Sequence, residues 1–354
     1  MDLASALATL PANPRIVVSG NHATPWHTLG LLDAALGEYR LWVLNGQPGL
    51  PDRDGVTLET SFVGPGMRRS PRLSYVPSRL SMVPTLFARE LPPDAVVLHT
   101  TRPRNGAVSL GVEVNVLPAA LESVRRRGGV VIAQVNDRMP WTYGDAVVDL
   151  DLVDVLVEAD AALPTAPVTT IDDASAQIGE LVAARVPDGA TLQAGIGAVP
   201  DATMHGLAVR SGLRVWTEMF SDSVLALEKV GALDRSVPIT ASFLFGSPEL
   251  LAWVDGNERV AMVRTEETNN PARIARNPAM TSVNTALQVD LLARRTRRGS
   301  MRASTPASAV RPTSSWAPCT APGARRSSRC GPGTRRPTAP PWCRWSTSRS
   351  PRSR

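Results

Sequence analysis

The sequence predicts an α/β fold made of two similar open α/β domains that follow one another along the chain. Three observations support this prediction. Short apolar runs of strand length alternate with helix-like segments in the first half, and the same alternation returns in the second half. In addition, 43% of the 354 residues are apolar, which is enough to bury two ordinary cores.

The first half holds five strand-like runs separated by helical segments, which is the order expected for a mostly parallel sheet. These runs are residues 15–19, 40–44, 95–99, 130–135 and 153–157. We assign residues 1–163 to an N-terminal domain. Residues 164–186 follow as a linker and a first helix, for which Asp172 or Asp173 is a suitable N-cap.

The second half repeats the pattern, and we assign residues 187–291 to a second domain. Its strands are expected near residues 190–194, 213–217, 238–244, 259–264 and 280–289. One of the short helices between them begins after Ser221, a natural N-cap. Asp222 suits the positive end of this helix, and Gly231 suits its end.

The composition changes abruptly after Asp290. No Asp or Glu follows it, whereas fifteen of the 38 basic residues, all arginines, lie between Arg294 and Arg354. The net charge of +6 therefore hides a value of −9 for the first 291 residues. Three interpretations compete for residues 292–354: a basic nucleic-acid-binding arm, a disordered linker, or a stretch read out of frame. The absence of lysine and of any periodicity favours an out-of-frame, disordered tail, so we expect no nucleic-acid partner.

Several classes of protein are disfavoured by the same composition. The N-terminus lacks the basic region of a signal peptide, and no apolar run approaches the ~20 residues that span a bilayer, so we expect a cytoplasmic protein with no membrane partner. The first 291 residues contain no cysteine, which leaves no thiolate ligand there. We also expect no metal site, because the histidines are scattered without ligand-spaced neighbours; they are His22, His27, His99 and His205.

A glycine turn and a single carboxylate make up the most informative motif. The turn from Gly195 to Gly197 follows a strand-like run and precedes a helix with Pro200 in its first turn. Glu218 follows the next run, at the end of the strand where open α/β sheets bind ligands. Backbone amides at the start of the helix favour an anion. On the residues alone, an ordinary connection and a solvated or ion-paired glutamate remain alternatives.

Binding of a dinucleotide is a weaker interpretation of the same turn. A Rossmann fingerprint would need a third glycine at the position of Pro200. It would also need an acidic residue at the end of a following strand, and no residue there fits clearly. The motif therefore indicates a different kind of anionic ligand.

Five stretches together resemble the acetyl-CoA hydrolase/transferase family, whose members include 4-hydroxybutyrate CoA-transferase. They are residues 75–77, 132–144, 192–202, 217–222 and 268–287. The similarity runs from about residue 15 to 291. Several motifs in the order of the family are far more specific than any one of them. Ser223 departs from the family, in which glycine commonly follows Ser-Asp.

The resemblance implies the NagB/RpiA/CoA-transferase-like fold and a set of site residues. Glu218 would be the nucleophile that forms a glutamyl-CoA thioester, and Asn269 would donate an amide hydrogen bond near the reacting carbonyl. As a local alternative, Asn269 is a turn asparagine before a proline. The residues expected to line the CoA are Gly195, Ile196, Gly197, Ala198 and Val199. The loop with His22 and His27 would face the acyl pocket.

The implied activity is transfer of CoA between an acyl-CoA, such as acetyl-CoA or 4-hydroxybutyryl-CoA, and a short-chain carboxylate. Coenzyme A would be a substrate, no metal or redox cofactor would be needed, and an intact member would form a homo-oligomer. Two alternatives are an acetyl-CoA hydrolase using the same site and a catalytically impaired remnant. The remnant is considered because family members continue past the region matching 284–291 into a Gly-Gly-Gln run, which is absent here, so the second domain is expected to be incomplete.

Overall fold

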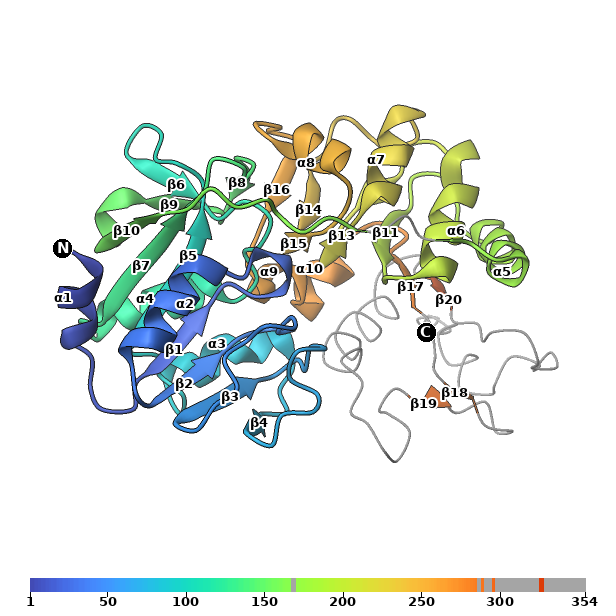
Figure 1. The fold of residues 1–354 in the computed structure, drawn as a ribbon. Helices are drawn as coiled ribbons and strands as arrows, with labels where there is room; N and C mark the ends of the chain where they lie inside the picture. The colour runs from blue at the N-terminus through green and yellow to red at the C-terminus, as the bar shows by residue number, and fades with distance from the viewer. Residues whose placement is uncertain (167–169, 285–287, 290–294, 297–324, 328–354) are drawn as a thin grey trace, which may run out of the picture.

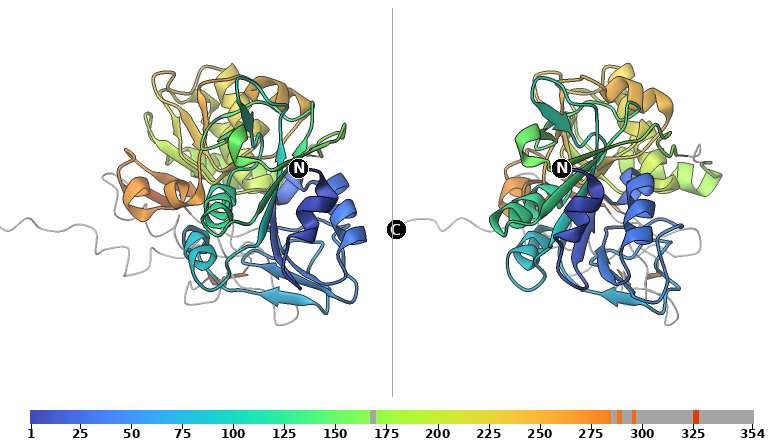
Figure 2. Two further views of the ribbon diagram at one scale, coloured as in Figure 1. Left: turned by 90° about the vertical axis from the view of Figure 1, so that its left-hand side faces the viewer. Right: turned by 60° about the vertical axis from the view of Figure 1, so that its left-hand side comes forward.

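The computed structural model describes residues 1–166 and 170–284, together with the short segments 288–289, 295–296 and 325–327. The prediction of an out-of-frame, disordered tail over 292–354 lies outside the described residues, apart from two short strands. In Figure 1 the first half of the chain surrounds one large sheet, and the second half lies beside it around smaller sheets. The two halves form one continuous body in the turned views of Figure 2.

The large sheet has seven strands in the order β10-β7-β5-β1-β2-β3-β4, and every neighbouring pair is parallel. Its strands, in chain order, are β1 (Arg15–Val18), β2 (Tyr39–Trp42), β3 (Val56–Thr60), β4 (Leu73–Tyr75), β5 (Ala95–Thr100), β7 (Val130–Val135) and β10 (Val155–Glu158). The helices of this half are α1 (Leu3–Ala8), α2 (Trp26–Ala35), α3 (Val83–Ala88) and α4 (Leu117–Arg126).

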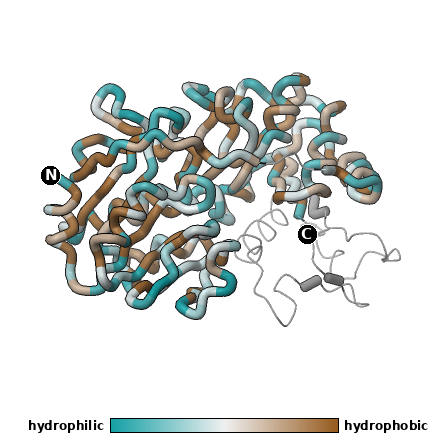
Figure 3. Tube along the Cα trace, viewed as in Figure 1, coloured by the Kyte–Doolittle hydropathy of each residue, from teal (hydrophilic) through white to brown (hydrophobic). Residues whose placement is uncertain are grey.

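The five strands expected in the first half are present as β1, β2, β5, β7 and β10. Every residue of β5 and β7 is buried, because helices cover both faces of a parallel sheet. The strands are accordingly among the more hydrophobic segments of the chain (Figure 3). Strand β3, whose run includes Glu59, was not expected from the sequence. This carboxylate is buried because Arg15 Nε donates to Glu59 Oε2 at 2.6 Å.

The second half contains three small parallel sheets. The first has the order β12-β11-β17-β20, the second β14-β16-β8, and the third pairs β13 with β15. The strands of these sheets are β8 (Tyr143–Gly144), β11 (Thr191–Ala194), β12 (Arg214–Val215), β13 (Met219–Phe220), β14 (Ile239–Ala241), β15 (Phe243–Leu244), β16 (Val260–Met262), β17 (Thr281–Val283) and β20 (Arg325–Ser327). Two antiparallel pairs join β6 (Ala107–Ser109) with β9 (Val147–Asp149), and β18 (Gln288–Val289) with β19 (Arg295–Thr296).

Two strands of the second half are shorter than expected. The run 213–217 gives only β12, after which the chain leaves that sheet and enters β13. The run 238–244 divides into β14 and β15 on either side of Ser242. The reason is a shared contact, since the N–H of Ser242 and that of Phe243 both donate to the carbonyl oxygen of Glu218, at 2.8 and 3.0 Å. The end of β12 and the division between β14 and β15 therefore lie next to each other, joined by the carbonyl oxygen of Glu218.

The helices of the second half are α5 (Asp173–Ala183), α6 (Ala198–Gly206), α7 (Asp222–Lys229), α8 (Pro248–Val254), α9 (Thr265–Thr268) and α10 (Pro271–Ala275). Helix α5 begins as expected, with Asp172 as N-cap accepting the N–H of Ser175. Helix α7 begins after Ser221, but the hydroxyl of Ser221 makes no capping bond. Gly231, just beyond its end, has the left-handed φ of 74° that favours glycine.

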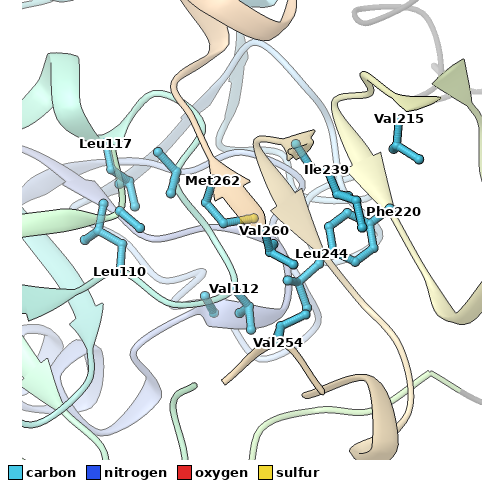
Figure 4. Packing of buried hydrophobic residues seen from close by; sticks show 14 of the residues in the cluster. Leu110, Val112, Leu117, Val215, Phe220, Ile239, Leu244, Val254, Val260 and Met262 are labelled. Carbon is cyan, nitrogen blue, oxygen red and sulfur yellow. The ribbon is translucent and has the colours of Figure 1, made fainter. Parts of the chain in front are cut away.

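The two halves share one core. Strand β8 belongs to the first half by sequence but pairs with β16 of the second. One cluster of buried apolar side chains includes residues of both halves, and Figure 4 shows Val112 of the first half beside Leu244 and Val254 of the second. The assigned boundary at 163 therefore lies after the seven-stranded sheet, but one small sheet and one apolar core include residues from both sides of it. No helix within the described ranges is long and apolar enough to cross a membrane.

Candidate active site

Glu218 lies where the chain passes from β12 to β13. Its backbone is fixed on both sides of this crossing. The N–H of Thr217 donates to the carbonyl oxygen of Thr240 at 3.0 Å, and the carbonyl oxygen of Glu218 accepts the two N–H groups at the break between β14 and β15. Because the bridge between Trp216 and Thr240 is parallel, Glu218 lies beyond the carboxyl ends of β12 and β14, as the sequence predicted.

The side chain of Glu218 is buried, with 8% of its surface exposed. Its Oε2 accepts a hydrogen bond of 3.1 Å from Asn269 Nδ2, and no described cation is within ion-pairing distance. Burial raises the pKa of Glu218 to about 8. The hydrogen bond from Asn269 opposes this rise, and the negative charge of Glu113 adds to it. The site therefore holds a strongly basic carboxylate.

Asn269 is the C-cap of α9 and is 2% exposed. Its Nδ2 also lies 3.3 Å from the hydroxyl of Thr268, which is 2.9 Å from the hydroxyl of Ser242. Because the N–H of Ser242 donates to Glu218, these four residues form a closed ring of hydrogen bonds. The role of turn asparagine before Pro271 belongs to the next residue, Asn270, which caps α10. This leaves the amide of Asn269 free to contact Glu218.

A cavity adjoins the Glu218 carboxylate. It is lined by Gln193, Trp216, Thr217, Glu218, Thr268, Asn269, Ile274 and Met280. The sequence analysis did not single out Gln193, the third residue of β11. Its Oε1 accepts from the hydroxyl of Ser282 and, at 3.0 Å, from Asn284 Nδ2. The only signal in the sequence was its position two residues before the glycine turn.

The glycine turn adjoins the same site. The hydroxyl of Thr217 reaches the carbonyl oxygen of Ala194 at 3.5 Å, and a second hollow is lined by Gly195 and Thr217 together. Gly197 is the N-cap of α6 with a left-handed φ of 115°, whereas Gly195 has no such strain. Ile196, between them, is 70% exposed. The turn therefore presents backbone next to the buried carboxylate, and glycine is required by conformation only at position 197.

The first turn of α6 can offer only part of an anion site. Ala198 and Val199 are the first two residues of the helix. Their amide hydrogens have no acceptor within the helix and point out of its N-terminal end. Pro200 has no amide hydrogen, and Asp201 places a negative charge in the same turn. An anion here would be bound by the amides of residues 197–199 rather than by a full helix terminus.

A second buried carboxylate, Glu113, lies in the segment between β6 and α4. It is 2% exposed, and both of its oxygens accept from Asn21 Nδ2, at 2.9 and 2.7 Å. Asn115 Nδ2 donates to Oε1 at 2.8 Å, and Asn45 Nδ2 donates to Asn21 Oδ1 at 2.8 Å. All three asparagines have left-handed φ values, of 46°, 39° and 47° for Asn21, Asn115 and Asn45. The sequence analysis missed this cluster.

Two of the four histidines, His22 and His99, are held in place by packing. His22 stacks on Phe245 with ring centroids 3.4 Å apart, and burial lowers its pKa to about 4, so the ring is neutral. His99 is buried at the end of β5, where its Nδ1 contacts the carbonyl oxygen of Ala23 at 3.1 Å. His27 is exposed. Among the described residues, no group of three or more His, Cys, Asp or Glu side chains is placed to hold a metal ion.

Comparison with known proteins gives a consistent result. The model of the acetyl-CoA hydrolase/transferase N-terminal domain matches residues 56–169, and that of the C-terminal domain matches residues 246–303. The chain is 36% identical over 242 residues to a 4-hydroxybutyrate coenzyme A transferase of Clostridium kluyveri, covering 65% of this chain and 56% of that protein. It is 32% identical over 303 residues to a succinyl-CoA:acetate/propanoyl-CoA:succinate CoA transferase of Fasciola hepatica, covering 78% and 61%.

The fold matches solved structures as well. A 4-hydroxybutyrate CoA-transferase of Porphyromonas gingivalis superposes with a TM-score of 0.70 at 26% identity, over 83% of this chain and 75% of that one. The α/β class with a large parallel sheet is thereby confirmed. The chain spans about three fifths of the length of the Clostridium kluyveri and Fasciola hepatica relatives.

Proposed function

Because the chain belongs to the acetyl-CoA hydrolase/transferase family, we propose that it transfers CoA between an acyl-CoA and a short-chain carboxylate, with Glu218 as the nucleophile. The observation that carries this proposal is the buried carboxylate of Glu218, bound by one amide donor beside a glycine turn. A carboxylate in this setting is poorly solvated and basic, and both properties favour attack on a carbonyl carbon.

In the proposed reaction the acyl group first moves from CoA to Glu218, and CoA then displaces the acyl group as a free carboxylate. An oxygen of Glu218 attacks the thioester carbon, the carbon–sulfur bond breaks, and CoA leaves as its thiolate. The thiolate then attacks the glutamyl carbon of the resulting anhydride and releases the first carboxylate, which leaves a glutamyl-CoA thioester. A second carboxylate reverses these steps. No proton is gained or lost in the sequence, so a site without a general acid can perform it.

Asn269 would act as a hydrogen-bond donor to the reacting glutamyl group. Its Nδ2 contacts Oε2 of Glu218 in the resting protein, and the same N–H can bind the oxyanion that forms when the thiolate attacks the glutamyl carbon. The ring through Thr268 and Ser242 fixes the Asn269 amide before the reaction begins. A preorganised donor of this kind is worth about 3 kcal/mol in the transition state.

The CoA would lie along the glycine turn. The amides of residues 197–199 face away from α6 and suit a phosphate oxygen, and the exposed side chain of Ile196 offers apolar surface to the pantetheine arm. This placement leads the thiol toward Thr217 and Glu218, because Thr217 lines both the hollow beside Gly195 and the cavity beside Glu218. Acetyl-CoA and 4-hydroxybutyryl-CoA are the donors we propose, with an acetate-like acid as acceptor.

Hydrolysis of acetyl-CoA at the same site is the competing function, since the family contains both activities. The burial of Glu218 favours transfer, because a covalent intermediate on a side chain that is 8% exposed is shielded from water. A carboxylate that occupies the acyl site can reach an intermediate that bulk water does not. The two functions differ in whether CoA turnover needs a second carboxylic acid.

The test combines an exchange assay with detection of the intermediate. Incubation with acetyl-CoA and isotopically labelled acetate should move label into acetyl-CoA, and mass spectrometry should find CoA attached to the peptide containing Glu218. Glu218→Ala should abolish both results, whereas Glu158→Gln, a change on the edge strand β10, should leave both intact. Release of free CoA from acetyl-CoA alone, at a rate unaffected by acetate, would instead identify a hydrolase. Exchange retained by Glu218→Ala would refute the assignment of the nucleophile.

A further inference from the structure

The buried carboxylate of Glu113 has no role in the reaction proposed above, yet hydrogen bonds fix both of its oxygens. Three hydrogen bonds from two amide groups reach its oxygens, from Asn21 and Asn115. Asn45 in turn fixes the amide orientation of Asn21, because it donates to Asn21 Oδ1 and so leaves Nδ2 directed at Glu113. Donors directed at both oxygens favour the ionised form of a carboxylate, whereas burial favours the neutral form. Burial outweighs the hydrogen bonds from Asn115 and Asn21 and raises the pKa of Glu113 to about 7, so this carboxylate is charged mainly above that pH.

No cation neutralises this carboxylate within the described part of the chain. Its described hydrogen-bond partners are neutral amides, and the ion pairs that the structure contains lie elsewhere. The ring of His22 next to Asn21 is neutral and stacked on Phe245. On the α9 side, Arg264 pairs with Glu122 at 2.8 Å and lies 4.0 Å from Glu266. The negative charge on Glu113 is therefore not cancelled locally.

The backbone of Glu113 is joined to that of Glu218 through one short segment. Glu113 forms an antiparallel bridge with Phe243, and the N–H of Phe243 donates to the carbonyl oxygen of Glu218 at 3.0 Å. On either side of this bridge, Val112 accepts the N–H of Leu244 at 3.0 Å, and Val114 donates to Ser242 at 2.9 Å. Figure 4 shows Val112 packed beside Leu244 in the shared core.

This arrangement places two buried carboxylates on opposite sides of residues 242–244, each contacted by neutral amides and with little exposure to water. Like charges in a poorly screened interior repel one another, and that repulsion destabilises the state in which both are ionised. In the covalent intermediates proposed above, Glu218 carries no charge, because the negative charge has left with the thiolate or the released carboxylate. The repulsion is then absent.

We propose that Glu113 is a positioning residue that drives Glu218 toward its covalent intermediate by electrostatic repulsion. The amides of Asn21 and Asn115 favour the charged form of Glu113 against the effect of burial, and the segment 242–244 fixes its distance from Glu218. Glu113 touches no reacting atom. The consequence for the reaction rests on the proposed transferase function, but the repulsion itself is a property of the resting protein.

The repulsion can be measured without catalysis. In protein labelled with carbon-13 at the glutamate carboxyl, the Glu218 signal is assigned by its loss in Glu218→Gln and followed by NMR over pH 4 to 10. The midpoint for Glu218 should fall by about one pH unit in Glu113→Gln. It should stay within a few tenths of the wild-type value in Glu113→Asp, which keeps the charge, and in the surface control Glu158→Gln. An unchanged midpoint in a folded Glu113→Gln protein would overturn the proposal.

A second result of the same experiment needs only Glu113→Asp, in which the loss of one glutamate signal assigns Glu113. Coupled carboxylates titrate as a pair, so the wild-type Glu218 signal should show two inflections, one of which coincides with the midpoint of Glu113. A single inflection, with no step at the Glu113 midpoint, would overturn the proposal even if Glu113→Gln does not fold.

The consequence for the reaction is tested by the fraction of protein that carries CoA at equilibrium. At pH 8.5, with fixed acetyl-CoA and acetate, the ratio of glutamyl-CoA to free protein should be about tenfold lower in Glu113→Gln, which corresponds to one pH unit of repulsion. If the wild-type protein forms no adduct while the titration shift is present, the transferase function fails and the repulsion stands. If the adduct forms equally in both proteins and the midpoints agree, the repulsion fails and the transferase function stands.

Discussion

Asn269 Nδ2 lies 3.1 Å from Glu218 Oε2, although 51 residues separate the two in the sequence. The contact depends on a break in two strands. Glu218 stands where the chain leaves β12, and its carbonyl oxygen binds the N–H of Ser242 where β14 ends. The hydroxyl of Ser242 then contacts Thr268, the residue before Asn269. One irregular point in the second half thus places both the carboxylate and its donor.

The first prediction concerns this donor. Asn269→Ala should lower kcat for CoA transfer by about a hundredfold to a thousandfold, because it removes a preorganised donor from a buried site. It should also raise the pKa of Glu218 further, since the hydrogen bond from Asn269 lowers it. Steady-state kinetics with acetyl-CoA measures the first effect. Asn277→Ala is the matched control, because that amide donates only to the backbone carbonyls of Arg273 and Ile274 within α10. Equal rates in the two variants would contradict the assigned role.

The second prediction concerns the glycine turn. Gly197→Ala should weaken CoA binding and destabilise the turn by about 1 kcal/mol, because φ at this position is 115° and alanine rarely adopts it. A side chain at 197 would meet open space, so conformation and not a clash is the cause. Gly231→Ala is the control, because φ there is also left-handed, at 74°, and a side chain would also meet open space, but Gly231 lies outside the turn proposed to bind CoA. Calorimetric titration with CoA should separate the two variants, and equal losses would contradict this account.

The sequence could predict the structural position of those residues whose position depends on their neighbours along the chain. Glu218 follows a strand at the carboxyl edge of a sheet, and the turn before α6 contains its glycines within three positions, so both were placed correctly. Strands β5 and β7 could be predicted because they are buried on both faces and therefore continuously apolar. These patterns need no knowledge of what lies across the fold.

The remaining features depend on partners far away in the sequence. The buried Glu113 accepts hydrogen bonds from Asn21, which lies 92 residues earlier, and no local sequence pattern predicts this contact. Strand β3 was missed because Glu59 reads as polar until Arg15 is seen to pair with it. The division of the run 238–244 at Ser242 likewise requires the carbonyl oxygen of Glu218. Tertiary contacts decide these cases against the local sequence.

The third prediction concerns the dependence of activity on pH. The attacking group is the ionised carboxylate, and burial holds the pKa of Glu218 at about 8 in the protein without substrate. The value of kcat/KM for acyl-CoA should therefore rise with pH and level off above about 8, since this ratio reports the free enzyme. Measurement between pH 5 and 9.5 at constant ionic strength tests this. A rate already constant above pH 6 would show that Glu218 is ionised there and would contradict the prediction.

The last prediction links the same carboxylate to stability. The pKa of Glu218 is raised from its ordinary 4.5 to about 8, so below pH 4.5 the side chain is neutral in both the folded and the unfolded chain. Between these values the unfolded chain releases the proton and the folded protein keeps it. The free energy of unfolding therefore falls as pH rises, by up to about 1.4 kcal/mol per pH unit for this one group, until it levels off above about 8.

Glu218→Gln removes this titration and should thus become more stable relative to wild type as pH rises from 5 to 8. Any fixed cost of the new amide, such as an unsatisfied N–H beside Asn269, is the same at both pH values and cancels in the comparison. Urea unfolding of both proteins at pH 5, 6.5 and 8 measures the difference, and Glu158→Gln at the exposed end of β10 should show no such trend. A difference that stays constant across this range would mean that Glu218 is already ionised in the folded protein. The growing difference would instead show that the fold gives up stability to keep a basic carboxylate at its centre.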